Sequence, residues 1–130
     1  MTGRVAVRLY AASSARDTLF TAKLCDVYPD ARSMLLLDGA LRAACRESVA
    51  NPSPIEPQRI YEFNIDLGST SIIFNRGHRL RVDISSSNAP RFAAHPNVWG
   101  GGQSQAARQT IYYGGKHPSA VILPVARKVR

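Results

Sequence analysis

The chain of 130 residues has only two cysteines, one tryptophan and three histidines, and it contains no long apolar run. Two cysteines, Cys25 and Cys45, are too few for a disulfide scaffold or a zinc site, so we expect each to act as a small apolar side chain. A disulfide between them, or a reactive thiol, is the alternative. The longest apolar stretches are as short as Met34 to Leu37, which excludes a membrane-spanning helix and a membrane partner.

The N-terminus has no apolar signal-peptide core. Met1 to Arg4 leads directly into alternating sequence, and we therefore expect a cytoplasmic protein. The length suits one domain, 1–130, and a hydrophobic content of 45% is enough for a buried core. No internal repeat and no linker marks a second domain.

Acidic residues are almost missing from the second half of the chain, where Asp83 is the only one among residues 67–130. Residues 1–66 carry eight basic and eight acidic residues, so the net charge of +8 comes entirely from the second half. Such a field favours anionic partners. The sequence has no helix–turn–helix, zinc-finger or aromatic RNA-binding motif, so specific nucleic-acid binding is not expected. A solvated basic face or a docking surface is favoured, and a polyanion-binding domain is an alternative.

Catalytic motifs are missing as well. Gly68-Ser69-Thr70-Ser71 lacks the closing glycine of a nucleophile elbow, and the Ser85-Ser86-Ser87 run is typical of a strand end whose hydroxyls bond to nearby backbone. The histidines His78, His95 and His117 have no partners at metal-ligand spacing, and we expect them at the surface or in corners. The sequence therefore predicts no catalytic residue, no metal site and no cofactor.

Strand-like alternation of apolar and polar residues is the dominant pattern. His78 to Ser85 is the clearest case: Leu80, Val82 and Ile84 should point inward, with Asp83 outside in an ion pair with Arg79 or Arg81. The same alternation predicts strands over residues 5–10, 19–28, 33–37, 60–67, 110–113 and 120–125.

The segments between these strands read as turns and loops. Residues 28–32 and 38–39 are predicted turns, residues 12–16 a loop, and residues 70–74 a short helical turn. Residues 40–47 fit either a helix or a strand. About eight short strands with turns every 8–12 residues favour an all-β antiparallel sandwich or barrel, and the long connections favour a jelly-roll arrangement.

Several ordered blocks resemble the C-terminal domain of the X-Pro dipeptidyl-peptidase family, which includes cocaine-esterase-like, α-amino-acid ester hydrolase and glutaryl acylase enzymes. The similarity extends over nearly the whole chain. The blocks are Asp17 to Leu24, Asp26 to Asp30, Leu37 to Gly39, Gly77 to Asn88, Pro90 to Phe92 and Thr110 to Pro124.

The resemblance implies a jelly-roll β-sandwich similar to galactose-binding-like modules. It also implies that the serine, aspartate and histidine of the family's triad lie in a separate α/β-hydrolase domain, so none is carried onto this sequence. The chain is then a non-catalytic domain that supports or shapes the active site of a serine hydrolase, and it is not expected to be active alone.

The sequence departs from the family pattern in several places. The family usually has an acid where Leu19 stands, a large apolar residue where Ala89 stands, and polar residues around Ala93 to Pro96. The family's sandwich also has a strand before Thr2, so the resemblance implies that this chain lacks the first strand. A bare strand edge invites pairing, and we expect a homo-oligomer or an α/β-hydrolase catalytic domain as partner.

The long loop between Asn88 and Gln105 is the candidate surface that faces a catalytic domain. The alternative function is a stand-alone jelly-roll module that binds carbohydrate or another small ligand. The aromatic residues of such a binding site would otherwise be interpreted as packing in the core or in corners. An autonomous hydrolase is the least favoured function. The candidate ligand or docking residues are Asn88, Arg91, Phe92, His95, Trp99, Tyr112 and Tyr113.

Overall fold

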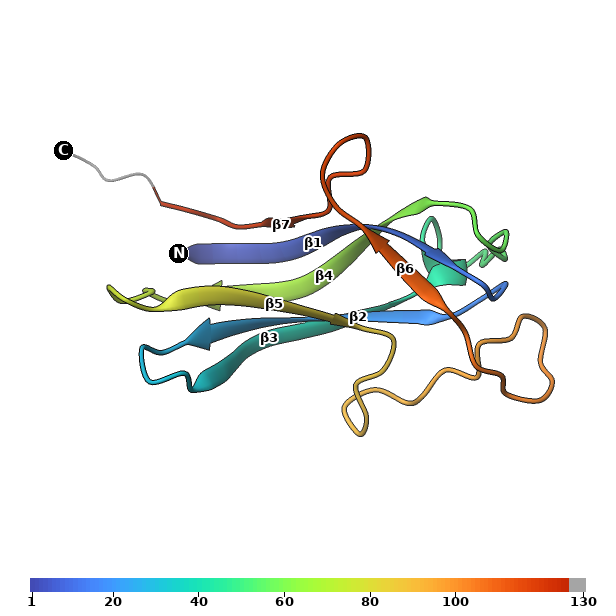
Figure 1. Cartoon of the computed structure of the whole chain (residues 1–130), viewed down its shortest axis with the longest axis horizontal. Helices are drawn as coiled ribbons and strands as arrows, with labels where there is room; N and C mark the ends of the chain where they lie inside the picture. The colour runs from blue at the N-terminus through green and yellow to red at the C-terminus, as the bar shows by residue number, and fades with distance from the viewer. Residues whose placement is uncertain (127–130) are drawn as a thin grey trace.

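The computed structural model describes residues 1–126, which form seven β-strands and one short 3-10 turn (Figure 1). The last four residues of the expected 1–130 domain lie outside the described residues. Within residues 1–126, no helix is long and apolar enough to span a membrane. The elements are β1 (Thr2–Ser13), β2 (Leu19–Val27), β3 (Ser33–Arg42), η1 (Ala43–Cys45), β4 (Tyr61–Ser71), β5 (Arg79–Ser85), β6 (Gln109–Tyr112) and β7 (Ala120–Ile122).

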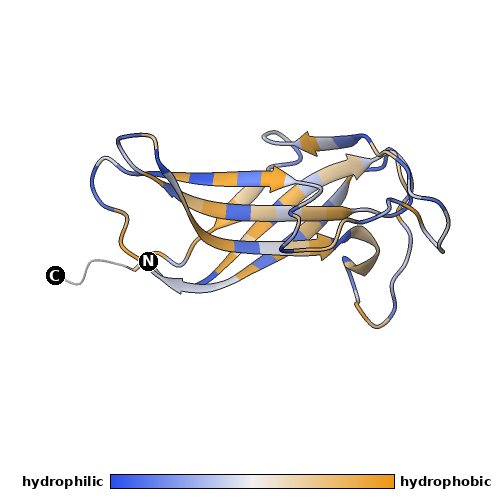
Figure 2. Ribbon diagram, turned by 90° about the horizontal axis from the view of Figure 1, so that it is seen from below, coloured by the Kyte–Doolittle hydropathy of each residue, from blue (hydrophilic) through white to orange (hydrophobic). Residues whose placement is uncertain are grey.

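Two antiparallel sheets pack face to face. One has the strand order β4-β1-β6, with β7 also paired to β1, and the other has the order β3-β2-β5. Figure 2 shows hydrophobic and hydrophilic residues alternating along the strands, as expected where one face of each strand is buried. The predicted all-β, two-sheet sandwich is therefore confirmed.

The core lies between the sheets. In β1 the alternation of Val5, Val7 and Leu9 places these side chains inside, where each is at most 3% exposed. They meet the inner face of β2, and the rings of Phe20 and Phe63 pack with their centroids 4.9 Å apart. The strand predicted over residues 5–10 is confirmed, and these three residues form its inner face.

Strands β6 and β7 occupy one strand position beside β1. Tyr112 of β6 pairs with Tyr10, and Ala120 of β7 pairs with Arg8. The chain therefore leaves the sheet after β6 and rejoins the same edge of β1 two residues further along. Residues 113–119 form the projecting loop at the top of Figure 1. The Ser119 hydroxyl accepts a hydrogen bond from the Tyr10 N–H at 2.9 Å. The sheet is therefore three strand positions wide.

The predicted turn at Asp38-Gly39 is wrong, because both residues lie inside β3. Gly39 is required for close packing rather than for a turn. A Cβ atom there would lie 2.3 Å from the carbonyl oxygen of Asp66 in β4. This backbone contact brings the two sheets together and seals one side of the sandwich.

Other boundaries also differ from the sequence prediction. Strand β1 continues through Ser13, into the predicted loop, because its end pairs with β6. The predicted helical turn at 70–74 is wrong: Thr70 pairs with Gly3 and extends β4. Residues 40–45 divide between the end of β3 and η1, and residues 46–47 form a bend. The predicted turn at 28–32 is confirmed, since the Ala31 N–H donates to the Tyr28 carbonyl at 2.9 Å.

Candidate docking surfaces

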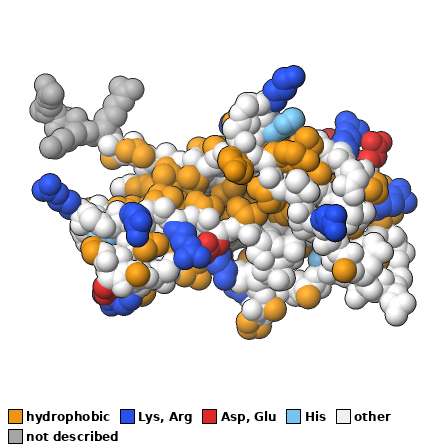
Figure 3. All heavy atoms as spheres, viewed as in Figure 1, with side chains coloured by type: hydrophobic (Ala, Val, Ile, Leu, Met, Phe, Trp, Pro, Cys, Tyr) orange, Lys and Arg blue, Asp and Glu red, His pale blue; other side chains and the backbone are white. Residues whose placement is uncertain are grey.

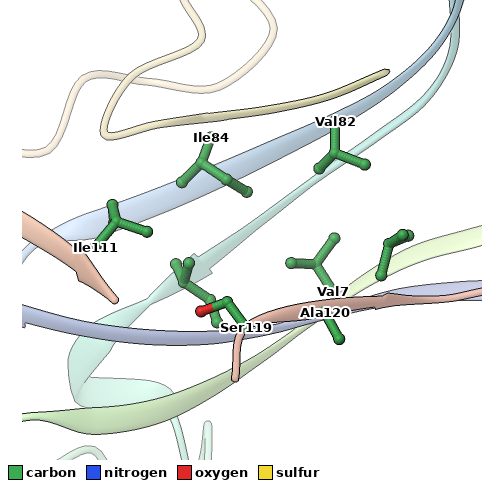
Figure 4. Close-up of a pocket in the computed structure, with 8 residues that line it drawn as sticks. Val7, Val82, Ile84, Ile111, Ser119 and Ala120 are labelled. Carbon is green, nitrogen blue, oxygen red and sulfur yellow. The ribbon is translucent and has the colours of Figure 1, made fainter. Parts of the chain in front are cut away.

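An apolar groove opens between β5 of one sheet and β6–β7 of the other (Figure 4). Its volume is about 210 Å³. Figure 3 shows the hydrophobic side chains gathered in a band across this face of the molecule, with Lys and Arg around it. The groove is lined by Val7, Leu9, Val82, Ile84, Ile111, Ser119, Ala120 and Val121.

The groove continues past Ile84 and Ile111 into a second hollow of about 250 Å³, which Gln109 and Ser86 also line. The Gln109 Nε2 atom donates to the Thr18 hydroxyl at 2.7 Å. Its Oε1 atom is buried and has no hydrogen-bond partner within the described residues. Among the residues that line the second hollow, Gln109 thus keeps a buried acceptor without a partner in residues 1–126.

The groove exists because the sandwich is sealed on only one side. On the closed side β3 meets β4 at Gly39, whereas on the other side β5 pairs with β2 and with no further strand of residues 1–126. The inward residues Val82 and Ile84 are consequently only half-buried, and Leu80 is 37% exposed. The inward direction predicted for Val82 and Ile84 is confirmed, because both side chains pack against the core. Leu80 lies outside this core cluster and is exposed, so its predicted inward position is wrong.

The loop that joins β5 to β6, residues 86–108, folds over the outer face of the β3-β2-β5 sheet. Asp38 of β3 holds it there: the carboxylate accepts hydrogen bonds from Asn88 Nδ2 at 3.2 Å and from Arg91 Nε at 3.4 Å. The Ala89–Pro90 peptide bond between these two residues is cis. Sequence reasoning missed Asp38 because no local pattern links β3 to a loop 50 residues away.

A buried carboxylate fixes the far part of the same loop. Asp17 is fully buried, and its oxygens accept hydrogen bonds from the Thr18 and Ala44 N–H groups and from Arg42 Nε at 2.9, 3.0 and 2.6 Å. His95 Nε2 lies 3.4 Å from the same carboxylate. This contact anchors the candidate docking residue His95 to the core. A buried carboxylate such as Asp17 is normally stabilised by several partners of this kind.

The candidate aromatic residues lie in two separate places. Trp99 and Phe92 belong to the 86–108 loop. The Arg42 guanidinium lies over the Trp99 ring, 5.8 Å from the ring centroid. Tyr112 lies at the end of β6, beside the His117 ring, and Tyr113 on the projecting loop is 86% exposed. Figure 1 shows the two loops on opposite sides of the molecule, so these residues do not form one site.

His78 directly follows the turn at residues 76–77, which is the predicted corner position, but it is not at the surface. Its side chain is 11% exposed and its Nδ1 atom lies 2.9 Å from the Asp26 carboxylate. The Tyr28 ring packs edge-on at 4.4 Å between centroids, which encloses the pair. The hydrogen bonds of His78 and His95 within residues 1–126 include no serine hydroxyl. Within the same residues no three His, Cys, Asp or Glu side chains gather as metal ligands would.

Three smaller predictions can be checked directly. Cys25 and Cys45 are free thiols, so the disulfide alternative is wrong. Asp83 forms the expected ion pair, with Arg81 Nε 2.7 Å from its carboxylate. The Ser85 hydroxyl accepts a hydrogen bond from the Ser87 N–H at 3.2 Å, as expected for a strand end.

The fold and its surfaces define an accessory β-sandwich with an open apolar side. Residues 1–122 match the model of the X-Pro dipeptidyl-peptidase C-terminal non-catalytic domain. The chain belongs to this family of C-terminal non-catalytic domains.

Named relatives agree with this assignment. The chain is 42% identical to the cocaine esterase of Rhodococcus sp. (strain MB1 Bresler) over 134 residues, which covers 98% of the chain and 23% of the esterase. An aminopeptidase from the marine sediment archaeon Thaumarchaeota archaeon superposes with a TM-score of 0.87 at 26% identity, covering 92% of this chain and 22% of that one. An α-amino acid ester hydrolase superposes with a TM-score of 0.85 at 25% identity, with coverages of 92% and 23%. The chain thus spans less than a quarter of the length of these relatives.

Proposed function

We propose that this domain packs against the α/β-hydrolase catalytic domain of a serine hydrolase and shapes the approach to its active site. The apolar groove beside β5 carries the proposal, because apolar surface of this kind is usually covered by a partner. The relatives provide a suitable partner, since more than three quarters of their length lies outside the match.

The 86–108 loop is the second contact surface in this proposal. Asp38 and Asp17 tether it at two points, so its shape is set before a partner arrives. Preorganised loops lose less conformational entropy on binding than free ones. Arg91 remains 65% exposed in its side chain and is available to an acidic group of the catalytic domain.

The decisive experiment is a chimera. The matched segment of the Rhodococcus cocaine esterase is replaced by this chain, and hydrolysis of a chromogenic ester is measured beside the parent enzyme and the truncated enzyme without the segment. We expect the chimera to recover at least about a tenth of the parent kcat/KM, whereas the truncated enzyme and the isolated chain show none.

A folded, soluble chimera that hydrolyses no ester would contradict the proposal. Far-ultraviolet circular dichroism and thermal unfolding establish that it is folded. Turnover by the isolated chain above a heat-inactivated sample would contradict it in a different way, because the domain would then be an enzyme itself.

Self-association through an exposed strand edge is the second candidate, and it is favoured by the side of β5 that pairs with no strand in the described part of the chain. Unpaired N–H and C=O groups on such an edge can pair with the same edge of another copy. Light scattering on a sizing column at low and high salt tests this for the isolated chain. A salt-resistant dimer is the expected result, and a monomer of 14.2 kDa at every concentration contradicts it.

The remaining expectations stay predictions. The jelly-roll and galactose-binding-like character, the binding of carbohydrate or polyanions, and the cytoplasmic location are all compatible with the domain. The aromatic residues named for carbohydrate binding lie on opposite sides of the molecule, which makes this function less favoured than docking.

A further inference from the structure

His95 closes a turn in the 86–108 loop through its side chain. The Asn97 N–H donates to the His95 Nδ1 atom at 2.9 Å. Aspartate and asparagine form the same turn when their side chains accept from the backbone N–H two residues further on. An imidazole can accept in this way only while Nδ1 carries no proton, so the turn requires the neutral ring with its proton on Nε2.

Asn97 connects this turn to the core and to the rest of the loop. Its Oδ1 atom accepts a hydrogen bond from the hydroxyl of the fully buried Thr18 at 2.7 Å. Its Nδ2 atom donates to the Gln105 carbonyl at 3.0 Å, and its own carbonyl accepts from Gln105 Nε2 at 2.8 Å. Asn97 therefore closes the base of residues 98–104, which we call the loop tip, and fixes that base to the sandwich.

The loop tip packs loosely beyond its base. Its glycines at positions 100–102 are exposed and adopt positive φ, and a Cβ atom added at any of them would meet no atom of residues 1–126 within 4 Å. The ring of Trp99 lies under the Arg42 guanidinium. The position of the tip consequently depends on the hydrogen bonds that Asn97 makes.

The charged groups that face the His95 ring within residues 1–126 are Asp17, between β1 and β2, and Arg42, at the end of β3. One Asp17 oxygen lies 3.4 Å from His95 Nε2 and 2.6 Å from Arg42 Nε. The guanidinium already balances the carboxylate charge, so a second cation on the ring gains little attraction there. The loss of Nδ1 as an acceptor then decides what protonation does.

We propose that His95 is a pH-dependent latch for the loop tip. The neutral ring holds Asn97 and closes the base of the tip. Protonation replaces the Nδ1 acceptor with an N–H that faces the Asn97 N–H, and the tip is released. Because the closed loop binds one proton fewer than the released loop, it loses stability as the pH falls through the range of histidine titration, from about pH 8 to about pH 5.

The latch is a property of this chain by itself. Its consequence for docking rests on the proposed function, in which the 86–108 loop is a contact surface with a shape set in advance. In acid this surface would lose its fixed shape, and binding would then have to order it again.

Trp99 provides a direct readout, because it is the only tryptophan in the sequence. Quenching of its fluorescence by acrylamide, a neutral molecule, measures how accessible the loop tip is in the isolated chain. We expect the quenching constant to rise at least about twofold between about pH 8 and about pH 5. Circular dichroism at both pH values establishes that the sandwich stays folded.

Two substitutions at His95 separate the hydrogen bond from the charge. His95→Asn should keep the low quenching constant at both pH values, because an asparagine side chain accepts from the same backbone N–H and does not titrate. His95→Ala has no acceptor and should show the high constant at both. The matched control is His117→Asn, which removes a titrating ring beside Tyr112 on the projecting loop and should respond to pH as the native chain does.

Each result decides for or against the latch. A rise that His95→Asn abolishes and His117→Asn preserves supports it. A rise that persists in His95→Asn assigns the response to another group and overturns it. An equal or lower constant in acid for the native chain also overturns it, since attraction of the ring to Asp17 then balances or outweighs the lost bond.

The alanine variant adds a further check. Equal constants for folded His95→Ala and the native chain at about pH 8 would show that the Nδ1 bond does not hold the tip, and would overturn the latch. If His95→Ala is unfolded, the comparison rests on His95→Asn, which retains the bond. All of these results come from the isolated chain, so an inactive chimera would count against the proposed function and leave the latch standing.

Discussion

Gly39 of β3 and Asp66 of β4 approach each other so closely that a Cβ atom on Gly39 would lie 2.3 Å from the Asp66 carbonyl oxygen. The atom it would meet belongs to the backbone of a paired strand, which cannot turn aside as a flexible side chain can. The contact brings β3 against β4 and leaves the opposite side of the sandwich as the open one. A glycine at this position is therefore a requirement of the sheet packing.

Replacing Gly39 with alanine should destabilise the domain. The added methyl group forces the two sheets apart locally, and overpacking of this kind costs about 1–3 kcal/mol of unfolding free energy. Urea denaturation followed by tryptophan fluorescence or circular dichroism measures the change. Ala40→Ser is the matched control on the neighbouring residue, whose side chain points to the other face, and it should stay within about 0.5 kcal/mol.

Asp17→Ala should be among the most damaging single substitutions. It removes the acceptor of the Thr18 and Ala44 N–H groups and of Arg42, and it leaves the buried donors without partners. Loss of a buried, hydrogen-bonded charge partner costs about 2–4 kcal/mol. Thermal and urea unfolding measure the loss. Glu56→Ala, which removes an exposed ion pair with Arg59, is the control and should leave the unfolding midpoint unchanged.

Asp38→Ala should release the part of the 86–108 loop around Asn88 and Arg91 without unfolding the sandwich. The substitution removes the acceptor of Asn88 and Arg91, while the strands on either side keep their pairing. Local opening exposes a loop to proteases more than global unfolding does. Tryptic cleavage after Arg91 should become several-fold faster, and Asp83→Ala on the same outer face should not change it. Equal cleavage rates in the two variants would show that Asp38 does not hold the loop.

The strands were predictable wherever alternation continues without interruption. Residues 79–85 alternate strictly and form β5. The turn at Pro29 connects the two strands of a hairpin, as its sequence indicates. The family was predictable too, because residues 77–88 resemble a block of its sequences and the family model matches residues 1–122. These features depend on residues that are neighbours in the chain, where local patterns carry the information.

The errors concern contacts between distant residues. Asp38-Gly39 has the local sequence of a turn. The glycine is instead required by the close approach of the Asp66 backbone, and the Asp38 carboxylate accepts hydrogen bonds from Asn88 and Arg91. The pairing of His78 with Asp26 likewise joins residues 52 positions apart. The groove was not predictable because it arises from which edges remain free, a property of strand order rather than of any one strand.

The pKa of Asp66 gives a prediction for the pH dependence of stability. The Gly68 N–H, which donates to this carboxylate at 2.8 Å, and the ion pair with Arg4 hold the pKa of Asp66 below its usual range. A group whose pKa is lower in the folded state stabilises that state above the unfolded pKa, and this stabilisation is lost as the pH falls through the folded pKa. The difference in unfolding free energy between the native chain and Asp66→Asn should therefore be largest near neutral pH and shrink below about pH 4.

Nuclear magnetic resonance of the carboxyl carbons separates the two causes. In Arg4→Gln the pKa of Asp66 should rise only part of the way to its usual value, because the Gly68 N–H is the larger influence and remains in place. The Asp30 carboxyl, whose pKa is also lowered, chiefly by the backbone N–H of Arg32, should not respond to Arg4→Gln. A full return of the Asp66 pKa to the usual aspartate range in Arg4→Gln would assign the shift to the ion pair alone and contradict the backbone contribution.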